Sequence, residues 1–153
     1  MKDINRILLG VAILLLTLVL LRDVTPLVRI HGESMAPTYH DQEIVLVSAL
    51  KDLPGVQDVV VFTFEGEYLI KRVVGLPGDT IEIRAGHLYR NGQILPEDYL
   101  GESPSGNYPL VTVPQGKLFV LGDNRPVSLD SRSPEVGFVP LESLLGTVLL
   151  SLP

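Results

Sequence analysis

A serine and a lysine stand out because each occupies a position that is unusual for its residue type. Ser34 lies in HGESMAPTYH, residues 31–40, after a Gly-Glu pair and before a proline, where a turn is expected. Lys71 lies in EYLIKRVVGLPGD, residues 67–79, within a run of Val, Ile and Leu. A serine hydroxyl is a weak nucleophile until a base removes its proton, and a lysine that is desolvated in an apolar sheet can be that base. These two residue types therefore fit the chemistry of a Ser-Lys dyad.

Histidine is the more common base for a serine nucleophile, and His31 is close to Ser34 in the sequence. The segment HGESMA lacks the second glycine of a G-x-S-x-G elbow, and a chain this short cannot supply the parallel sheet of an α/β-hydrolase. A Ser/His/Asp triad is thus the weaker alternative. The three histidines, His31, His40 and His87, are too scattered to indicate a metal site, so no metal and no cofactor are expected.

Lys71 is followed directly by Arg72, and both lie in the middle of a predicted strand. Successive strand side chains point to opposite faces, so the two cations separate. If both faces are covered, Arg72 requires a carboxylate partner because its guanidinium stays protonated, whereas Lys71 can lose its proton. The alternative is an edge strand whose charged side chains point into water.

A second polar cluster lies in LFVLGDNRPVSLDSR, residues 118–132, where a predicted strand runs into a turn. Asp123 could neutralise Arg72, Asp130 could pair with Arg132, and a serine hydroxyl could orient the amine of Lys71. The alternative is a solvated loop that is capped by its own Asp, Asn and Ser side chains.

The elements that position these residues are predicted to be mostly strands. After residue 26 the chain consists of short Val, Ile, Leu and Phe runs that are separated by Gly and Pro, which is typical of β structure. We predict a coiled antiparallel β-sheet domain. Its strands are expected at 27–31, 43–47, 58–64, 67–74, 80–84, 87–90, 117–121 and 146–151. Hairpin turns are expected at Glu65-Gly66, Ala85-Gly86 and Asn91-Gly92.

The amino-terminal region differs from the rest of the chain. Residues 7–21, ILLGVAILLLTLVLL, carry no charge and are bracketed by Arg6 and Arg22, a pattern that predicts one transmembrane helix. The alternatives are a cleaved secretory signal, although no small-residue cleavage site follows, and a buried helix of a soluble protein. Lys2 and Arg6 favour a cytoplasmic amino terminus. Residues 1–24 are therefore predicted to form a cytoplasmic tip and membrane anchor, and residues 25–153 an extracytoplasmic β-rich domain.

Composition excludes several classes of function. The 153 residues have a formal net charge of −6 and contain no Lys/Arg-rich block, which argues against binding to nucleic acid. With no cysteine, the chain has no disulfide framework, no thiolate metal site and no cysteine nucleophile. A nucleophile in this chain must be oxygen or nitrogen.

Three segments, GESMAPT, YLIKRVVGLPGD and GDNRPVSLDSR, occur in this order after the apolar segment. Together they resemble the conserved boxes of type I signal peptidases of the S26 family, and the likeness extends over nearly the whole chain. The resemblance implies the signal-peptidase fold and a Ser-Lys endopeptidase in the plasma membrane, with its β-rich domain on the outer face. Its implied partners are membrane lipid and preprotein signal peptides, which bind as an added strand and are cleaved after a small residue.

The resemblance also implies a role for each matched residue. Ser34 resembles the nucleophile, Lys71 the general base, and Ser128 the serine that orients the lysine. Arg72 with Asp123, and Asp130 with Arg132, resemble structural ion pairs of the family. The positions that line the shallow pockets for small substrate side chains are matched by Ile30, Met35, Tyr39, Leu69 and Ile70.

Two positions depart from many members of the family. Gly32 stands where some members have a serine that binds the oxyanion, and Pro126-Val127 stands where many have Asp-Asn. The short segment between Lys71 and Gly122, together with Gly32, indicates the compact Gram-positive-like form. Three alternatives remain: a self-cleaving repressor domain, an inactive relative that assists assembly of surface proteins, and an organelle inner-membrane peptidase.

Overall fold

The computed structural model describes residues 4, 6–13, 15, 26–49, 53–102 and 104–152. Nearly all the regular structure after residue 25 is β-strand. The elements are β1 (Leu27–Arg29), β2 (Ile44–Ser48), β3 (Val59–Phe64), β4 (Glu67–Gly75), β5 (Thr80–Arg84), β6 (His87–Arg90), β7 (Gln93–Ile94), β8 (Tyr108–Thr112), β9 (Lys117–Leu121), β10 (Val139–Pro140), the 3-10 helix η1 (Leu141–Ser143) and β11 (Leu144–Leu152).

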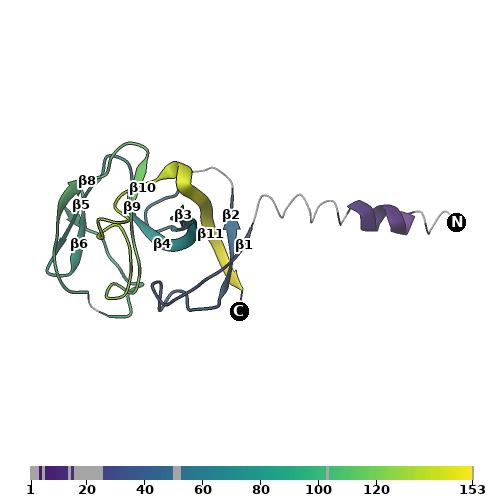
Figure 1. The fold of residues 1–153 in the computed structure, drawn as a ribbon, viewed down its shortest axis with the longest axis horizontal. Helices are drawn as coiled ribbons and strands as arrows, with labels where there is room; N and C mark the ends of the chain where they lie inside the picture. The colour runs from purple at the N-terminus through teal and green to yellow at the C-terminus, as the bar shows by residue number, and fades with distance from the viewer. Residues whose placement is uncertain are drawn as a thin grey trace.

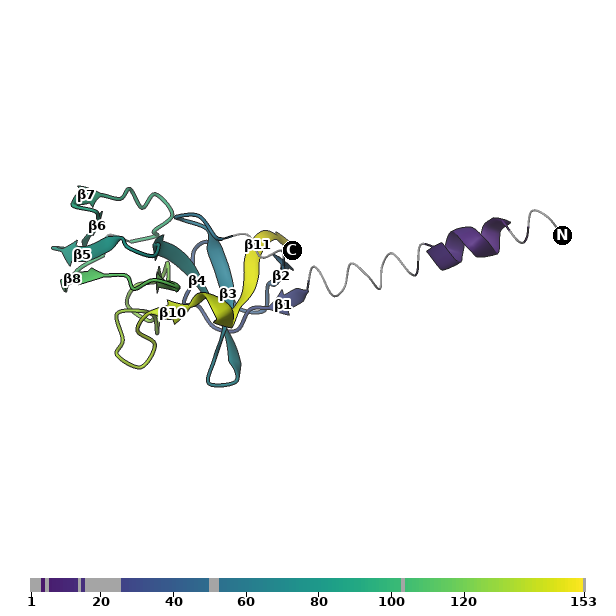
Figure 2. The same cartoon turned by 90° about the horizontal axis from the view of Figure 1, so that it is seen from above.

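The strands form two antiparallel sheets. The larger sheet has seven strands in the order β1-β2-β11-β3-β4-β9-β10, and the smaller has four in the order β7-β6-β5-β8. The two sheets lie at opposite ends of the β domain in both views (Figures 1 and 2). The prediction of a mainly antiparallel β fold is confirmed.

All three predicted two-residue hairpin turns are present. Each has a positive φ at both central residues, the backbone of a type I′ turn, which matches the twist of the flanking strands. The φ values are 50° and 86° at Glu65-Gly66, 47° and 84° at Ala85-Gly86, and 53° and 76° at Asn91-Gly92.

Three short strands, β7, β8 and β10, were not predicted. All three are edge strands, β7 and β8 in the smaller sheet and β10 in the larger. Edge strands are exposed along one side and tolerate proline, so they lack a strong apolar pattern. Pro109 in β8 and Pro140 in β10 are examples.

The centre of the larger sheet is covered on both faces. On one face Val59 and Val61 of β3 pack in the same cluster as Ile70 of β4. On the other face Val60 and Phe62 pack with residues of β4 and β9. Strand β4 lies between β3 and β9, so both of its edges are paired. Because both faces are also packed, the middle of β4 is buried, and any charge there is removed from water.

At the amino end, residues 6–13 are helical and exposed. Within the residues that the structure describes, no helix is long and apolar enough to cross a membrane. Residues 14 and 16–21 of the predicted anchor lie outside the described residues. The transmembrane helix and the division at residue 24 therefore stay predictions.

Candidate active site

Ser34 lies on a tight turn that is held from two directions. The turn begins at Gly32, whose φ is 84° and whose N–H donates to Asp41 Oδ1 at 2.7 Å. The side chain of Met35 is fully buried beneath the turn. On the other side, the backbone N–H of Asn124 donates to the carbonyl oxygen of Ser34 at 3.0 Å. These contacts fix the backbone of Ser34 while its side chain stays half-buried.

Lys71 is buried in β4, opposite Val60 of β3. Only 2% of its surface is exposed, so the alternative of an edge strand with solvated charges is wrong. Its Nζ donates to Ser34 Oγ at 2.8 Å and to the carbonyl oxygen of Ile70 at 2.8 Å. The sheet therefore places the amine of Lys71 directly against the hydroxyl of Ser34.

The environment of Lys71 favours the neutral amine. Burial lowers the pKa of Lys71 from its ordinary 10.5 to about 8, even though the carboxylates of Asp130 and Asp123 act to raise it. Desolvation dominates because an ammonium group loses its hydration in an apolar sheet. About half of the amine is thus neutral near pH 8 and able to accept a proton from Ser34.

Among the described residues, no hydrogen bond joins His31 to Ser34 or Lys71. Its ring is exposed, and its Nδ1 lies 3.4 Å from Nε2 of Gln42. The geometry therefore favours pairing of Ser34 with Lys71 over the Ser/His/Asp alternative.

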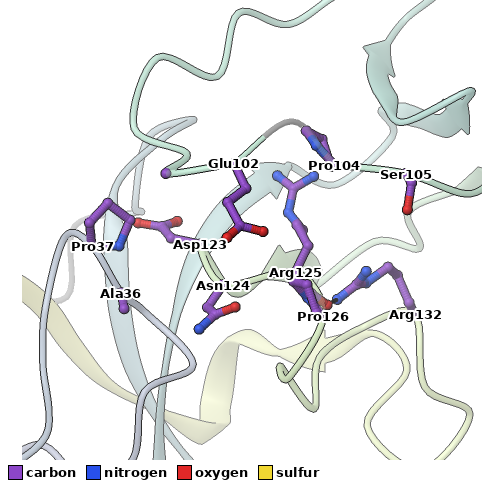
Figure 3. Close-up of a pocket in the computed structure, with 11 residues that line it drawn as sticks. Ala36, Pro37, Glu102, Pro104, Ser105, Asp123, Asn124, Arg125, Pro126 and Arg132 are labelled. Carbon is purple, nitrogen blue, oxygen red and sulfur yellow. Dashed lines mark hydrogen bonds between the residues drawn. The ribbon is translucent and has the colours of Figure 1, made fainter.

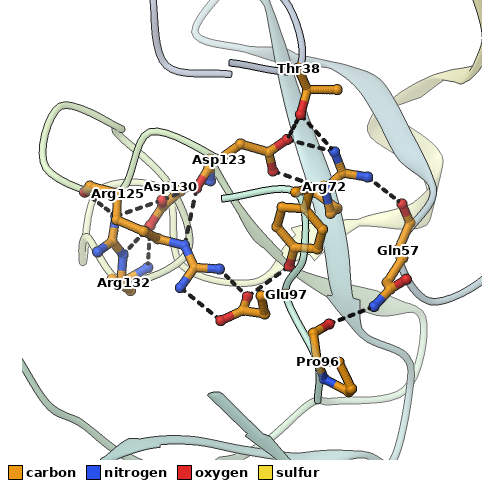
Figure 4. Close-up of polar contacts among 11 residues, drawn as sticks. Thr38, Gln57, Arg72, Pro96, Glu97, Asp123, Arg125, Asp130 and Arg132 are labelled. Carbon is orange, nitrogen blue, oxygen red and sulfur yellow. Dashed lines mark hydrogen bonds and ion pairs between the residues drawn. The ribbon is translucent and has the colours of Figure 1, made fainter. Parts of the chain in front are cut away.

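Arg72 has a buried carboxylate partner in Asp123 (Figure 4). Its Nε and Nη2 donate to Asp123 Oδ1 and Oδ2 at 2.8 and 2.5 Å. Thr38, from the turn that carries Ser34, donates its hydroxyl to Asp123 Oδ2 at 2.5 Å. The hydrogen bond and charge of Asp123 outweigh burial and raise the pKa of Arg72. This bidentate pair links β4, the 122–132 loop and the Ser34 turn.

A second ion pair organises the 122–132 loop from within. Asp130 is 1% exposed, and its two carboxylate oxygens each accept from Arg132 at 2.8 Å. The N–H of Gly122 donates to Asp130 Oδ2 at 3.0 Å. The alternative of a solvated loop is wrong, since Asp123, Asp130 and Ser131 are all buried.

Ser128 lies where this loop contacts the Ser34 turn. Its Oγ is buried and has no hydrogen-bond partner among the described residues. A Cβ on Gly122 would come within 2.1 Å of this Oγ and 2.5 Å of the carbonyl oxygen of Ser34. The missing side chain at Gly122 is what allows Ser128 to pack so close to the Ser34 turn.

A small cavity of about 40 Å³ lies beside the pair. It is lined by β1, the residues that follow it, and β4, which are separated by three strands in the sheet order, so the larger sheet must curl. Among the predicted pocket residues, Ile30, Leu69 and Ile70 line this cavity. Met35 and Tyr39 do not line it; they pack in the hydrophobic cluster that also contains Ile30 and Ile70.

A larger cavity of about 470 Å³ lies elsewhere (Figure 3). Its walls include Ala36 and Pro37 from the turn that carries Ser34, and Asp123 and Arg132 from the 122–132 loop. Neither Ser34 nor Lys71 lines it. Both Ser34 and Lys71 line the smaller cavity instead.

Comparison with known proteins shows the family of this chain. The family model for signal peptidase, peptidase S26, matches residues 4–152. The chain belongs to the S26 signal peptidase family. Members of this family are serine endopeptidases, so this S26 peptidase is a peptide-bond hydrolase. Its membership of the family supports a function in removing signal peptides.

Relatives of this S26 peptidase come from several bacteria. It is 38% identical over 133 residues to a probable signal peptidase I-1 of Synechocystis sp., which covers 78% of this chain and 67% of the relative. It is 37% identical over 132 residues to signal peptidase I of Bacillus amyloliquefaciens, with 77% and 70% covered. The crystal structure of a signal peptidase I from Enterococcus faecalis V583 matches with a TM-score of 0.58 and 39% identity, covering 65% of this chain and 98% of that chain.

Several residues that contact the two ion-paired arginines were not predicted from the sequence. Thr38 ends the GESMAPT segment, directly after Pro37, and this position in the same turn as Ser34 could have marked it as a site residue. Glu97 and Tyr99 lie in an irregular segment between β7 and β8, which carries no periodic pattern. In the structure the ring of Tyr99 lies against Arg72, and Glu97 pairs with Arg125.

Proposed function

We propose that this S26 peptidase cleaves preproteins after a small residue, with Ser34 as the nucleophile and Lys71 as the general base. The observation that carries the proposal is the 2.8 Å hydrogen bond between Lys71 Nζ and Ser34 Oγ, made by a lysine residue that is 2% exposed. A base of this kind is what a serine hydroxyl needs to become nucleophilic at moderate pH.

In the first half of the reaction, Ser34 Oγ attacks the carbonyl carbon of the scissile bond while its proton passes to the neutral amine of Lys71. The tetrahedral intermediate then collapses. The bond to the leaving nitrogen breaks, and the Lys71 ammonium gives its proton to that nitrogen. The products are an ester between Ser34 and the signal peptide, and a free amino terminus on the mature protein.

In the second half, a water molecule loses a proton to Lys71 and attacks the ester carbon. Collapse of this intermediate releases the signal peptide as a carboxylic acid, and the proton on Lys71 returns to Ser34 Oγ. The negative oxygen in both steps needs a donor. We assign the backbone N–H of Ser34, which shares its peptide plane with the Glu33 carbonyl, and that carbonyl accepts a hydrogen bond from Asn124 Nδ2 at 3.1 Å.

The residues around the dyad would keep the amine of Lys71 in place. Its ammonium form has three donors, of which two go to Ser34 and the carbonyl of Ile70. Ser128, whose buried Oγ has no partner in the described part of the chain, is the acceptor we assign to the third. The Arg72–Asp123 and Asp130–Arg132 pairs would hold the loop that carries Ser128.

The small cavity supports a preference for small side chains. A preprotein laid as an extra strand between β1 and β4 would place one side chain against Ile30, Leu69 and Ile70. About 40 Å³ accommodates a methyl group and rejects an aromatic ring. We therefore propose cleavage at Ala-x-Ala-like sequences, with Met35 and Tyr39 supporting the cavity wall from the cluster beneath it.

The uncharged segment 7–21 supports a membrane location. We propose a single-pass anchor in the plasma membrane, with a cytoplasmic amino terminus and the β domain on the extracytoplasmic face. Confining the enzyme and a membrane-tethered preprotein to one surface raises their effective concentration. A soluble peptide with the same cleavage site should be a poorer substrate.

The test uses the full-length protein in lipid vesicles and a purified preprotein with an Ala-x-Ala site. A matched preprotein carries Phe in place of the alanine at position −1. Mass spectrometry of the product should give one mature amino terminus directly after the alanine, and the Phe substrate should be cut at least about 100-fold more slowly. Equal cleavage of both substrates, or cutting at unrelated positions, would contradict the proposed specificity.

A further inference from the structure

The segment between β7 and β8 contributes a buried ion pair that the proposed reaction does not use. Glu97 and Arg125 pair through their carboxylate and guanidinium groups, and their side chains are 8% and 6% exposed (Figure 4). Arg125 also donates from Nε to the carbonyl oxygen of Gly122 at 3.1 Å. Removing two charges from water is unfavourable unless their geometry is well satisfied. The pair therefore ties residue 97 firmly to the start of the 122–132 loop.

Tyr99, two residues further along, contacts the strand of the dyad. The guanidinium carbon of Arg72 lies 4.0 Å from the centre of its ring, a cation–π geometry. The hydroxyl of Tyr99 donates to Glu97 Oε1 at 2.7 Å. Burial, reinforced by the Glu97 carboxylate, raises the pKa of Tyr99, so this hydroxyl stays protonated and remains a donor.

A third contact joins the same segment to β4. Gln57 donates from its side-chain Nε2 to the carbonyl oxygen of Pro96 at 2.9 Å. The backbone carbonyl oxygen of Gln57 accepts from Arg72 Nη1 at 2.8 Å. Residues 96–99 thus connect two guanidinium groups. One is adjacent in sequence to Lys71, and the other is bonded to Gly122, whose Cα faces both Ser128 and the carbonyl of Ser34.

We propose that Glu97 and Tyr99 are positioning residues, which lock the 122–132 loop onto β4 and so keep Ser128 and the Ser34 turn in register with the amine of Lys71. The inference deepens the proposed function and rests on it. Neither residue lines the cavity beside the dyad. Their effect should therefore fall on the rate of the chemical step and leave substrate binding nearly unchanged.

The chain offers a matched control in the smaller sheet. Asp79 is 7% exposed and accepts from Arg90 Nε and Asn91 Nδ2, each at 2.7 Å. Asp79→Asn and Glu97→Gln each remove one buried carboxylate from an arginine, so both should lower the melting temperature. Only Glu97→Gln should disturb the dyad, because Arg90 has no contact with the 122–132 loop among the contacts that the structure describes.

The experiment measures kcat and KM for the preprotein in vesicles, at a temperature where each variant is folded by circular dichroism. Glu97→Gln should lower kcat by about 10- to 100-fold and change KM by less than about 2-fold, since small misplacement of reacting groups is expensive in rate. Asp79→Asn should retain kcat within about 2-fold. Tyr99→Phe, which keeps the ring over Arg72 and loses only the hydroxyl, should lie between them, and Glu97→Asp should recover part of the lost kcat.

Amide hydrogen exchange gives a second readout that does not depend on activity. Glu97→Gln should accelerate exchange in residues 122–132 and leave β5 and β6 unchanged, while Asp79→Asn should do the reverse. Equal loss of kcat in both variants, or unaltered kcat and exchange in Glu97→Gln, would overturn the inference while the proposed function stands. If the unaltered protein cleaves no preprotein, the proposed function fails, and exchange at 122–132 still decides whether Glu97 holds the loop.

Discussion

The Nζ of Lys71 lies 2.8 Å from the Oγ of Ser34, although 37 positions separate the two residues in the chain. Lys71 reaches this position from the doubly covered strand β4, and Ser34 reaches it from an irregular turn. The apolar sheet removes water from the amine, and two buried ion pairs fix the loop behind it.

The first prediction concerns the pH dependence of cleavage. Burial lowers the pKa of Lys71 to about 8, and the proposed base is its neutral amine. The value of kcat/KM should therefore rise tenfold per pH unit below pH 8 and level off above it. Initial rates on a preprotein between pH 6 and 10 would measure the profile. A rate that does not change over this range would contradict the assignment of Lys71.

The second prediction concerns stability and follows from the same pKa. Lys71 has a pKa of about 8 in the folded protein and about 10.5 when exposed, so between these values the unfolded chain binds more protons than the folded protein. The free energy of unfolding should therefore rise with pH across this window, by up to about 3 kcal/mol from this group. Below pH 8 the buried ammonium lowers the free energy of unfolding by this full amount.

Lys71→Met removes that penalty and serves as the comparison. At pH 7 the variant should be more stable than the unaltered protein by about 1–3 kcal/mol, and the difference should shrink as the pH approaches 10.5. Urea unfolding of both proteins at several pH values would measure it. If the difference in unfolding free energy does not depend on pH, burial does not lower the pKa of Lys71.

The third prediction concerns the Arg72–Asp123 pair. Asp123→Asn leaves a buried guanidinium without its carboxylate, which should lower the free energy of unfolding by about 3–5 kcal/mol. The double variant Arg72→Met with Asp123→Leu removes both charges and should recover most of that stability. If the double variant is no more stable than Asp123→Asn, the uncompensated charge is not the cause of the loss.

The fourth prediction uses the close approach at Gly122. In Gly122→Ala the new methyl carbon would come within 2.1 Å of Ser128 Oγ and 2.5 Å of the Ser34 carbonyl oxygen, so the loop or the turn must shift. Activity should fall by at least about 100-fold. Gly55→Ala is the control, because the nearest atom to its Cβ is the carboxylate of Asp58 at 3.5 Å, an ordinary contact. Similar losses in both variants would argue against a special role for the gap at Gly122.

Much of this fold could be predicted because local chemistry dictates it. Asn91-Gly92 adopts positive φ at both residues at little cost in free energy, so these two residues alone predict the hairpin turn. A guanidinium inside an apolar strand demands a carboxylate, and the structure supplies Asp123 for Arg72. Edge strands such as β10, by contrast, pair on one side only, here with β9, and leave little trace in their own sequence.

The supporting residues of the site were harder to foresee. Glu97 and Tyr99 lie in a loop between two short strands, where a carboxylate and a phenol are usually solvated. Their burial arises only when this loop meets Arg72 and Arg125, from two distant parts of the chain. No periodicity or spacing within residues 96–99 predicts these contacts with the two arginines.

The most direct test of the dyad is cleavage of an Ala-x-Ala preprotein by the full-length protein and three variants in vesicles. Ser34→Ala and Lys71→Met should each lose more than about 10⁴-fold in kcat. Lys117→Met, which removes a lysine from β9, should cleave at nearly the rate of the unaltered protein. Retention of substantial cleavage by either Ser34→Ala or Lys71→Met would contradict the account.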